Sequence, residues 1–437
     1  MAPATPSPAP DDAGARLHAL AARLYRLPRS LTGDGVRQSL ALLAERIPLS
    51  LHEIPSGTEV FDWTVPKEWN LASAYLVAPD GRRFADIAGH NLHLVGYSLP
   101  MRARMPLAEL RPHLHSLPDR PDWIPYRTSY YKETWGFCLA QRELDSLPEG
   151  EYEVVIDATL EDGALTWGEC VLPGESSDEV LISAHSCHPQ LANDNLSGMV
   201  VAAALAERLA QRPQRRYTYR FLFAPGTIGA LVWLERRGGE AKRVRHGLVA
   251  ANLGDAGGFH YKRSWWGDAE IDRAVVAALA DLGESVEVES FVPFGYDERQ
   301  FSSPAFRLAV GSLTRSPWGR YPEYHTSADD LDFIRPQALA GSLAAYERVV
   351  EVLESNRRYQ SRNPSGEPRL GKRGLYRDLG GDDRGREKEL ALLWVLNLAD
   401  GAHDLLAIAE RSGLRYSEIL AATRALEAAD LLAPVPG

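Results

Sequence analysis

The chain has 437 residues, and its 45% hydrophobic and 24% charged content is that of an ordinary globular protein. Its formal net charge of -11 argues against nucleic acid or an anionic membrane as the main partner, because both attract clustered lysine and arginine. A chain of this length is expected to form one large domain and one or two smaller ones.

The N-terminal region is expected to begin with a disordered tail over residues 1–13, which lack the basic and apolar regions of a signal peptide. No later run is apolar enough to span a membrane. The three cysteines are odd in number and far apart, so a disulfide framework is not expected. A reducing, cytoplasmic location is the simpler interpretation. Over residues 14–58, apolar residues at helical spacing predict two helices, Ala15 to about Leu27 and 36–47, that pack on the main domain.

Residues 59–165 have the texture of a separate, inserted β domain. Short strand-like runs alternate here with proline and glycine turns, and aromatic residues are concentrated. The segment also contains four histidines, His90, His93, His113 and His115. Imidazoles scattered over a turn-rich β segment can bind metal, but they are more often structural.

Residues 166–360 alternate regularly between strand and helix patterns. This alternation predicts an α/β domain with a mainly parallel sheet covered by helices on both faces. Predicted strands include Val180–Ser183, 219–224, 247–252 and 306–310, and predicted helices include 199–210, with Ser197 as its cap, 228–236, 271–282 and 337–353.

Residues 361–437 begin with a linker rich in proline, glycine and charge, followed by three short predicted helices. The spacing of helix, glycine turn and helix is that of a winged-helix module. From Arg386 onward the chain has five lysines or arginines against eight aspartates or glutamates, so DNA reading is not expected. We expect this module to have a docking or dimerising role, and we expect the protein to form a homo-oligomer.

The stretch from Ser183 to Gly198 carries the strongest chemical signal. His185, His188 and Asp194 lie on a predicted turn between a buried strand and a helix, with Cys187 between the imidazoles. In an open α/β sheet, such turns lie at the carboxyl edge of the strands, where ligands usually bind.

Two later turns carry further polar residues, with Asp255 in one and His325 in the other. If the sheet is parallel, these turns share one edge with the first, so His185, Asp194, Asp255 and His325 can converge. Two imidazoles and two carboxylates are plausible ligands for zinc.

These motifs resemble those of the zinc aminopeptidase superfamily, in which a His-x-Asp motif, a bridging Asp, a Glu-Glu pair, an Asp and a late His-Thr hold two zinc ions. More closely, the chain is similar to a bacterial family of aminopeptidase-like proteins with a β insertion and a C-terminal winged-helix domain. The motifs that carry this resemblance are Phe61-Asp-Trp-Thr-Val-Pro-Lys-Glu-Trp69, Ile124-Pro-Tyr, Trp135-Gly-Phe-Cys, His185-x-Cys-His-Pro, Asp297-Glu-Arg-Gln and Glu323-Tyr-His-Thr-Ser.

The resemblance implies that His185, Asp194 and Asp255 hold one zinc ion, and that Asp194 and His325 hold a second ion or complete a single site. Cys187 stands where the superfamily has an orienting Asp, and it either ligates as a thiolate or packs. His188 either joins the ligands or supports them.

The resemblance fails at the superfamily's Glu-Glu pair, whose positions are taken by Gly226 and Thr227. Such a peptidase needs a base for its nucleophilic water, and glycine supplies none. Glu298 and Glu323 are the candidates to replace it, because each adjoins a predicted site turn.

The remaining charged residues near these turns leave two alternatives open. Asp297, Arg299 and Arg315 are candidate substrate-binding residues, and the two arginines suit a substrate carboxylate. Alternatively, Asp297, Glu298 and Arg299 form an internal ion-pair network.

The sequence therefore leads to a function hypothesis and an alternative. The first is a zinc-dependent, aminopeptidase-like hydrolase of a small amide, aminoacyl or short peptide substrate in a biosynthetic pathway. The second is a metal- or ligand-binding relative that has lost hydrolysis and acts as a scaffold.

Overall fold

The computed structural model describes residues 10–375 and 383–435. It divides into two compact units, one of Met1–Gly267 with Glu287–Ala344 and the other of Asp268–Val286 with Ala345–Gly437. Residues 1–9 of the expected tail lie outside the described residues. Helix α1 (Pro10–Tyr25) begins inside the segment for which a tail was predicted, and α2 (Asp34–Ala44) follows it.

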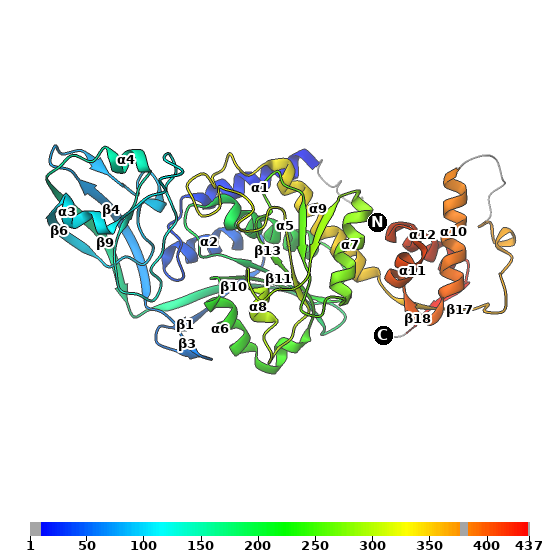
Figure 1. Cartoon of the computed structure of the whole chain (residues 1–437). Helices are drawn as coiled ribbons and strands as arrows, with labels where there is room; N and C mark the ends of the chain where they lie inside the picture. Colours follow the sequence, from blue (N-terminus) through cyan, green and yellow to red (C-terminus); the bar gives the residue numbers. More distant parts are fainter. Residues whose placement is uncertain (1–9, 376–382, 436–437) are drawn as a thin grey trace. The chain divides into compact units, whose positions relative to one another are not determined.

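An eight-stranded mixed sheet forms the centre of the first unit (Figure 1). Its four middle strands are parallel to one another, whereas the pairs toward the edges that involve β1, β10 and β14 are antiparallel. In spatial order the strands are β1 (Leu49–Pro55), β10 (Ala164–Leu172), β12 (Thr218–Ala224), β11 (Glu179–His185), β13 (Val244–Ala250), β16 (Val310–Thr314), β14 (Phe259–Lys262) and β15 (Val286–Glu289).

The middle strands are covered on both faces. All seven residues of β11 are buried, which matches the continuous apolar run typical of a parallel strand between helices. Helices α2 and α5 (Gly198–Ala210) lie on one side of the sheet, and α6 (Ile228–Arg237) and α8 (Glu298–Phe301) lie on the other (Figure 1). The predicted α/β fold with helices on both faces is therefore confirmed.

Two local predictions were wrong. The strand expected over 306–310 begins only at Val310, because the preceding residues follow a turn closed by Phe306 N–H on Ser303 O. Ser197 does not cap α5 either. Its hydroxyl donates to Asn193 O at 2.6 Å and accepts from Leu253 N at 2.8 Å, so it ties the Asn193 turn to the loop after β13.

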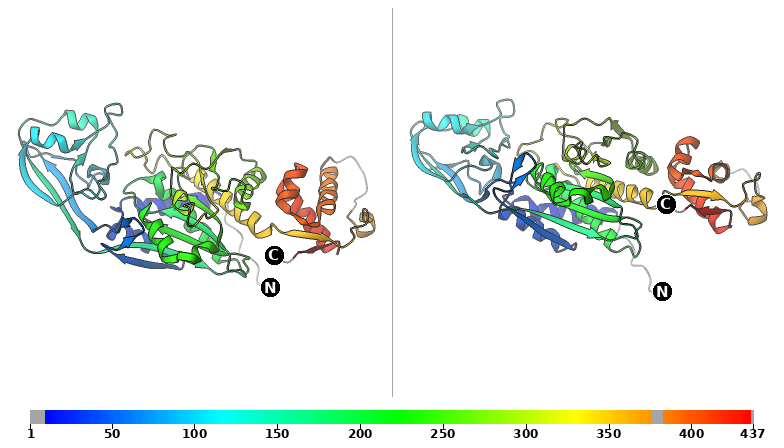
Figure 2. Two further views of the ribbon diagram at one scale, coloured as in Figure 1. Left: turned by 60° about the horizontal axis from the view of Figure 1, so that its bottom comes forward. Right: turned by 90° about the horizontal axis from the view of Figure 1, so that it is seen from below.

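The β-rich segment builds its own four-stranded antiparallel sheet, shown in blue and cyan beside the green strands of the central sheet (Figures 1 and 2). Two histidines of this segment have structural contacts. The His113 ring stacks on Trp135 at 3.7 Å, and His93 Nδ1 lies 2.8 Å from Cys138 O. The elements are β2 (Glu59–Val60), β3 (Trp63–Thr64), β4 (Glu68–Val77), β5 (Arg83–Phe84), β6 (Met101–Pro106), α3 (Leu107–Leu110), β7 (Leu114–His115), β8 (Phe137–Cys138), α4 (Gln141–Asp145) and β9 (Glu151–Glu161).

In the second unit, helices α10, α11 and α12 combine with a small sheet in the order β18-β17-β19, which is the arrangement of a winged helix. Helix α7 packs against it through Arg273, which pairs with Asp404 at 3.0 Å and with Glu410 at 2.8 Å. The elements of this part of the chain are α7 (Glu270–Leu282), α9 (Pro336–Ser355), whose residues the two units share, β17 (Arg358–Ser361), α10 (Asp383–Leu398), β18 (Asp400–Asp404), α11 (Leu405–Ser412), α12 (Tyr416–Ala428) and β19 (Leu432–Pro434).

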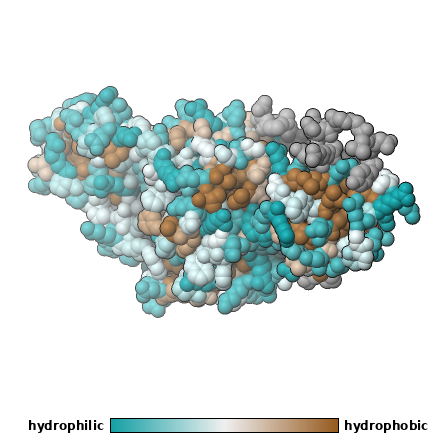
Figure 3. All heavy atoms as spheres, turned by 45° about the vertical axis from the view of Figure 1, so that its right-hand side comes forward, coloured by the Kyte–Doolittle hydropathy of each residue, from teal (hydrophilic) through white to brown (hydrophobic). Residues whose placement is uncertain are grey.

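The surface of the described residues is mixed in character. None of the described helices combines the length and the apolar character that crossing a bilayer requires. On the face drawn in Figure 3, brown hydrophobic side chains gather in patches that teal hydrophilic side chains separate. Exposed large hydrophobic side chains include Phe61, Trp266 and Phe294.

Candidate metal centre and its cavity

The candidate centre lies where β11 ends. His185 is the last residue of this strand, and Asp194 follows in the buried turn Ala192–Ser197 that leads into α5. The Asn195 side-chain amide donates to His185 O at 3.2 Å and to Ala250 O at 3.0 Å, so it ties the turn to the ends of two adjacent parallel strands.

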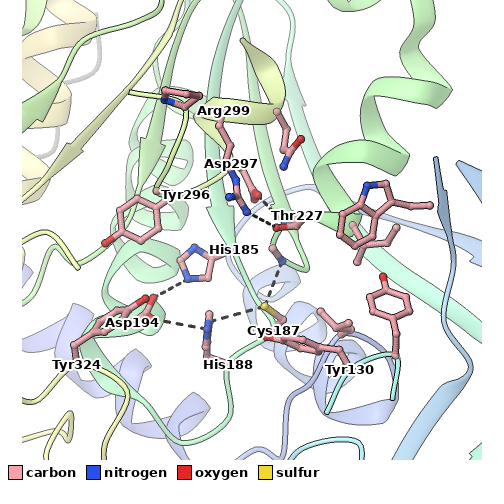
Figure 4. A pocket seen from close by; sticks show the side chains of 18 residues that line it. Tyr130, His185, Cys187, His188, Asp194, Thr227, Tyr296, Asp297, Arg299 and Tyr324 are labelled. Carbon is pink, nitrogen blue, oxygen red and sulfur yellow. Dashed lines mark hydrogen bonds and ion pairs between the residues drawn. The ribbon is translucent and has the colours of Figure 1, made fainter. Parts of the chain in front are cut away.

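Asp194 is the hub of the cluster. Its Oδ1 lies 2.7 Å from His185 Nε2, while its Oδ2 lies 3.0 Å from His325 Nε2 and 3.8 Å from His188 Nε2. Figure 4 shows the His185 and His188 side chains reaching Asp194 from the same side of the cavity. The potential ligand atoms of His185, His188 and Asp194 all lie within 4.8 Å of one another. Two imidazoles and a carboxylate suit zinc, so the residues present fit such an ion.

Electrostatics within the cluster favour an ionised Asp194. Burial opposes that charge, but the neighbouring imidazoles hold the pKa of Asp194 well below its ordinary value. Burial likewise opposes protonation of His185, yet Asp194 raises its pKa above the ordinary value. Burial lowers the pKa of His188 to about 3, which keeps this imidazole in the neutral form that a metal needs.

Asp329 supports Asp194 from behind. Its two carboxylate oxygens accept the backbone N–H groups of Asn193 and Asp194, the latter at 2.9 Å. Asp329 is fully buried, and burial raises its pKa to about 8. Sequence reasoning gave it no role, because nothing in its spacing distinguishes it from the adjacent Asp330.

Asp255, which the sequence predicts as a ligand, is buried and hydrogen-bonded by the loops around it. Its carboxylate accepts hydrogen bonds from the Asn193 side chain at 3.0 Å, Gly257 N at 2.7 Å and Ser316 Oγ at 2.7 Å. These donors already satisfy both oxygens, so Asp255 acts here as an anchor of the surrounding loops.

A cavity of about 630 Å³ opens beside the cluster, which is an ordinary size for a small-molecule site. His185, His188 and Asp194 line it together with aromatic rings from four parts of the chain. These rings belong to Trp63, Tyr130, Tyr131, Tyr296 and Tyr324. Composition alone did not reveal that these aromatic residues meet the metal-binding motif.

Gly226 and Thr227, which occupy the positions of the superfamily's Glu-Glu pair, also line this cavity. Neither residue offers the cavity a carboxylate. Gly226 N–H donates to Cys187 Sγ at 3.2 Å. Burial raises the pKa of Cys187 to about 12, which favours the protonated thiol in the absence of a metal ion. The Thr227 backbone has φ of 61° and donates its N–H to Asp297 Oδ1 at 2.7 Å.

The two glutamates predicted as acid–base residues do not suit that role. Glu298 is fully buried and forms an ion pair with Lys262, and among the described residues neither Glu298 nor Glu323 lines the cavity. Asp297 does line it, and burial raises its pKa above the ordinary value. Asp297 therefore offers the cavity a carboxylate next to the position that Gly226 leaves without a base, because it accepts the N–H of the adjacent Thr227.

The two candidate substrate-binding arginines also separate. Arg299 lines the cavity and donates to Thr227 Oγ1 at 3.3 Å (Figure 4). Arg315 instead donates to Ser342 Oγ at 2.9 Å and Gly257 O at 2.7 Å, and its guanidinium lies 4.5 Å above the Phe259 ring. It therefore holds loops together and does not reach the cavity.

Comparison with known proteins places the chain in a family. A family model described as a domain of unknown function, DUF4910, matches residues 18–356, and a winged helix-turn-helix model matches residues 357–434. The chain belongs to the DUF4910 family. A relative from Clostridium acetobutylicum, named for polysaccharide biosynthesis and an aminopeptidase-like domain, is 47% identical over 421 residues, or 96% of each chain.

Solved structures agree with this family and with the predicted aminopeptidase-like fold. A crystal structure from Clostridium acetobutylicum, described as a peptidase, is 46% identical, covers 98% of this chain and 97% of its own, and has a TM-score of 0.93. A zinc aminopeptidase from Bacillus subtilis shares the fold at 13% identity, with a TM-score of 0.55 over 78% of this chain and 94% of its own. This DUF4910 protein thus has an aminopeptidase-like fold and a C-terminal winged helix.

Proposed function

We propose that this protein is a zinc-dependent hydrolase of a small amide or aminoacyl substrate. The observation that carries the proposal is the placement of Asp194 between His185, His188 and His325 at one edge of the central sheet, beside a cavity. The aminopeptidase-like fold, and the naming of a close relative as a peptidase, support hydrolysis. The naming of another relative for polysaccharide biosynthesis supports a biosynthetic setting.

His185, His188 and Asp194 would hold one zinc ion, with His325 as a further ligand or as the ligand of a second ion. When bound, zinc polarises a carbonyl and makes water a stronger nucleophile at neutral pH. Because the low pKa of Asp194 and the raised pKa of His185 reflect their mutual attraction, zinc would compete with a proton on His185.

Asp297 would act as the proton acceptor of the reaction. It lines the same cavity as His185, and its raised pKa brings its acid–base behaviour closer to neutrality than that of an ordinary aspartate. Its position is fixed by the Thr227 N–H group at 2.7 Å. This assignment replaces Glu298 and Glu323, which the fold directs elsewhere.

A second function, binding without hydrolysis, is favoured by one observation. Gly226 and Thr227 put no carboxylate at the usual base position. Loss of an acid–base group typically lowers a rate by roughly two to four decades. A protein of this kind would keep its metal and its ligand but turn over slowly or not at all.

A hydrolysis panel separates the two functions. The full-length protein, loaded with zinc, is assayed on aminoacyl amides, N-acyl amino acids and short peptides. We expect turnover that is lost in His325→Ala and Asp297→Asn but kept in the control Glu323→Gln, which changes a carboxyl outside the cavity. Stoichiometric zinc without turnover on any substrate would favour the binding function.

A further inference from the structure

Arg299 is a half-buried arginine that lines the cavity and interacts with the charge of Asp297 only at longer range than an ion pair. Among the described residues, no carboxylate lies within ion-pair distance of its guanidinium, and its buried Nε has no hydrogen-bond partner. By contrast, Arg220 pairs with Glu179 at 2.8 Å and Arg37 pairs with Glu68 at 2.7 Å. A buried donor without an acceptor is costly, and this one belongs to a side chain that lines the cavity.

The short helix α8 directs this arginine into the cavity. Successive residues of a helix diverge by about 100°. Glu298 turns inward to Lys262, whereas the residues on either side of it, Asp297 and Arg299, line the cavity. Figure 4 shows Arg299 reaching toward Thr227, on the side of the cavity that carries His185 and Asp297.

The Arg299 guanidinium makes one hydrogen bond to the residues that the structure describes, which leaves most of its planar fork available. One terminal nitrogen donates to the uncharged Thr227 Oγ1 at 3.3 Å, which is long for a hydrogen bond. The geometry of an arginine fork matches an oxyanion such as a carboxylate, which can accept two parallel N–H groups.

We propose that Arg299 binds a free carboxylate of the substrate, so that the substrates are carboxylate-bearing amides of the N-acyl amino acid class. This inference rests on the proposed function for the amide bond, but its binding component does not. A singly charged carboxylate suits the cavity better than a phosphate, because Asp194 and Asp297 line the same space and repel each further negative charge.

The aromatic wall indicates what the rest of the substrate is like. Trp63 and Tyr131 are large rings that line the cavity while 41% and 49% exposed, and they meet edge to face at 5.8 Å. Such rings bury apolar surface of a ligand at little cost in conformational freedom. The substrate therefore combines a carboxylate with an apolar or aromatic side chain.

The test compares two ligands that differ only in charge, N-acetyl-L-phenylalanine and N-acetyl-L-phenylalaninamide. Their affinities for the full-length protein are measured by calorimetric titration, with zinc and after dialysis against a chelator. We expect the acid to bind roughly 10-fold or more tightly than the amide in both preparations, which is the strength of a charged hydrogen bond. Because the dialysed protein carries no metal, this result does not depend on hydrolysis.

Variants assign the preference to one side chain. In Arg299→Gln the acid-to-amide ratio should fall to about one, and Arg299→Lys should recover part of it, since lysine keeps the charge but loses the fork. Trp63→Ala should weaken the binding of both ligands and leave the ratio unchanged. The control Arg320→Gln removes a charge that pairs with Glu287 outside the cavity, and it should change neither affinity.

Several results would overturn the inference. These are equal binding of acid and amide to the unmodified protein, no binding of either, or a preference that persists in folded Arg299→Gln. A preference present only with zinc would assign the carboxylate to the metal. If inorganic phosphate displaced the acid at a lower concentration than acetate does, the site would be assigned to phosphate-bearing ligands and not to carboxylates. Failure of the hydrolysis panel alone would leave this inference standing.

Discussion

His325 Nε2 lies 3.0 Å from Asp194 Oδ2, although 131 residues separate the two in the chain. The contact exists because each residue follows one of the parallel strands β11 and β16, whose carboxyl ends lie at one edge of the sheet. The relationship of these two side chains connects the motif after β11 with the late His-Thr motif, and it is the basis of the candidate centre.

A carboxylate restored at residue 226 should increase hydrolysis. A Cβ atom at Gly226 would meet Cys187 Sγ at 3.5 Å and His185 Cβ at 3.7 Å, which are ordinary contacts, and residue 226 lines the cavity, so a side chain can start here without a clash. If Asp297 accepts the proton less effectively than a carboxylate at residue 226 would, kcat should rise in Gly226→Glu, by at most roughly two to four decades. Gly226→Gln, equal in size but without basicity, is the control. A similar kcat in both variants would show that another step is limiting.

Glu298 should matter for stability and not for metal binding. Replacement by Gln leaves the Lys262 ammonium buried without its counter-charge, and breaking such a pair costs about 3–5 kcal/mol. We expect this loss in the free energy of unfolding measured with urea, with zinc content unchanged by elemental analysis. Glu323→Gln, at a half-buried position, should change stability by less than about 1 kcal/mol. A stable, folded Glu298→Gln that had lost zinc would contradict this assignment.

These predictions show where the sequence was sufficient. The positions of β11 and α5, and the grouping of His185 with Asp194, follow from local pattern and short spacing. The approach of His325 follows from parallel strand order. The direction of side chains within α8 does not, because neighbouring residues on one helical turn point apart and only tertiary packing decides which of Asp297 and Glu298 faces the cavity.

Asp255 shows a second limit of the sequence. Its position after β13 places it at the edge formed by the carboxyl ends of the parallel strands, as expected. Three loops nevertheless supply N–H and O–H donors that hold its carboxylate. The spacing of residues in the sequence does not predict these hydrogen bonds. The aromatic lining of the cavity could not be predicted from the sequence either. Trp63 and Tyr131 reach the cavity from the segment 59–165, for which a separate domain is predicted.

The winged helix should not read DNA. Helix-turn-helix proteins contact bases with the first residues of their second helix, which corresponds here to α12. In this protein Ser417, at the start of α12, donates its N–H at 3.1 Å and its hydroxyl at 2.9 Å to Asp281 of α7. We expect no sequence-specific shift of duplex DNA at physiological salt. A shift with nanomolar affinity that survives competitor DNA would contradict the packing role.

Stability should decline on mild acidification because of His246. This β13 residue is 6% exposed, and burial lowers its pKa from the ordinary 6.5 to about 4. The unfolded chain therefore binds the proton more readily, so the contribution is complete above pH 6.5 and is lost as the pH falls toward 4, by up to about 3 kcal/mol. In His246→Gln the free energy of unfolding should differ less between pH 7.5 and pH 4.5. An equal difference in both proteins would exclude His246 as the cause.

Metal content tests the central claim most directly. The full-length protein is incubated with zinc, dialysed and subjected to elemental analysis beside Asp194→Ala and the control Glu323→Gln. Because Asp194 contacts both His185 and His325, its loss should remove the centre, so we expect one or two zinc ions per chain in the unmodified protein and the control, and none in Asp194→Ala. Retention of stoichiometric zinc by Asp194→Ala, or its absence from the unmodified protein, would contradict the assignment.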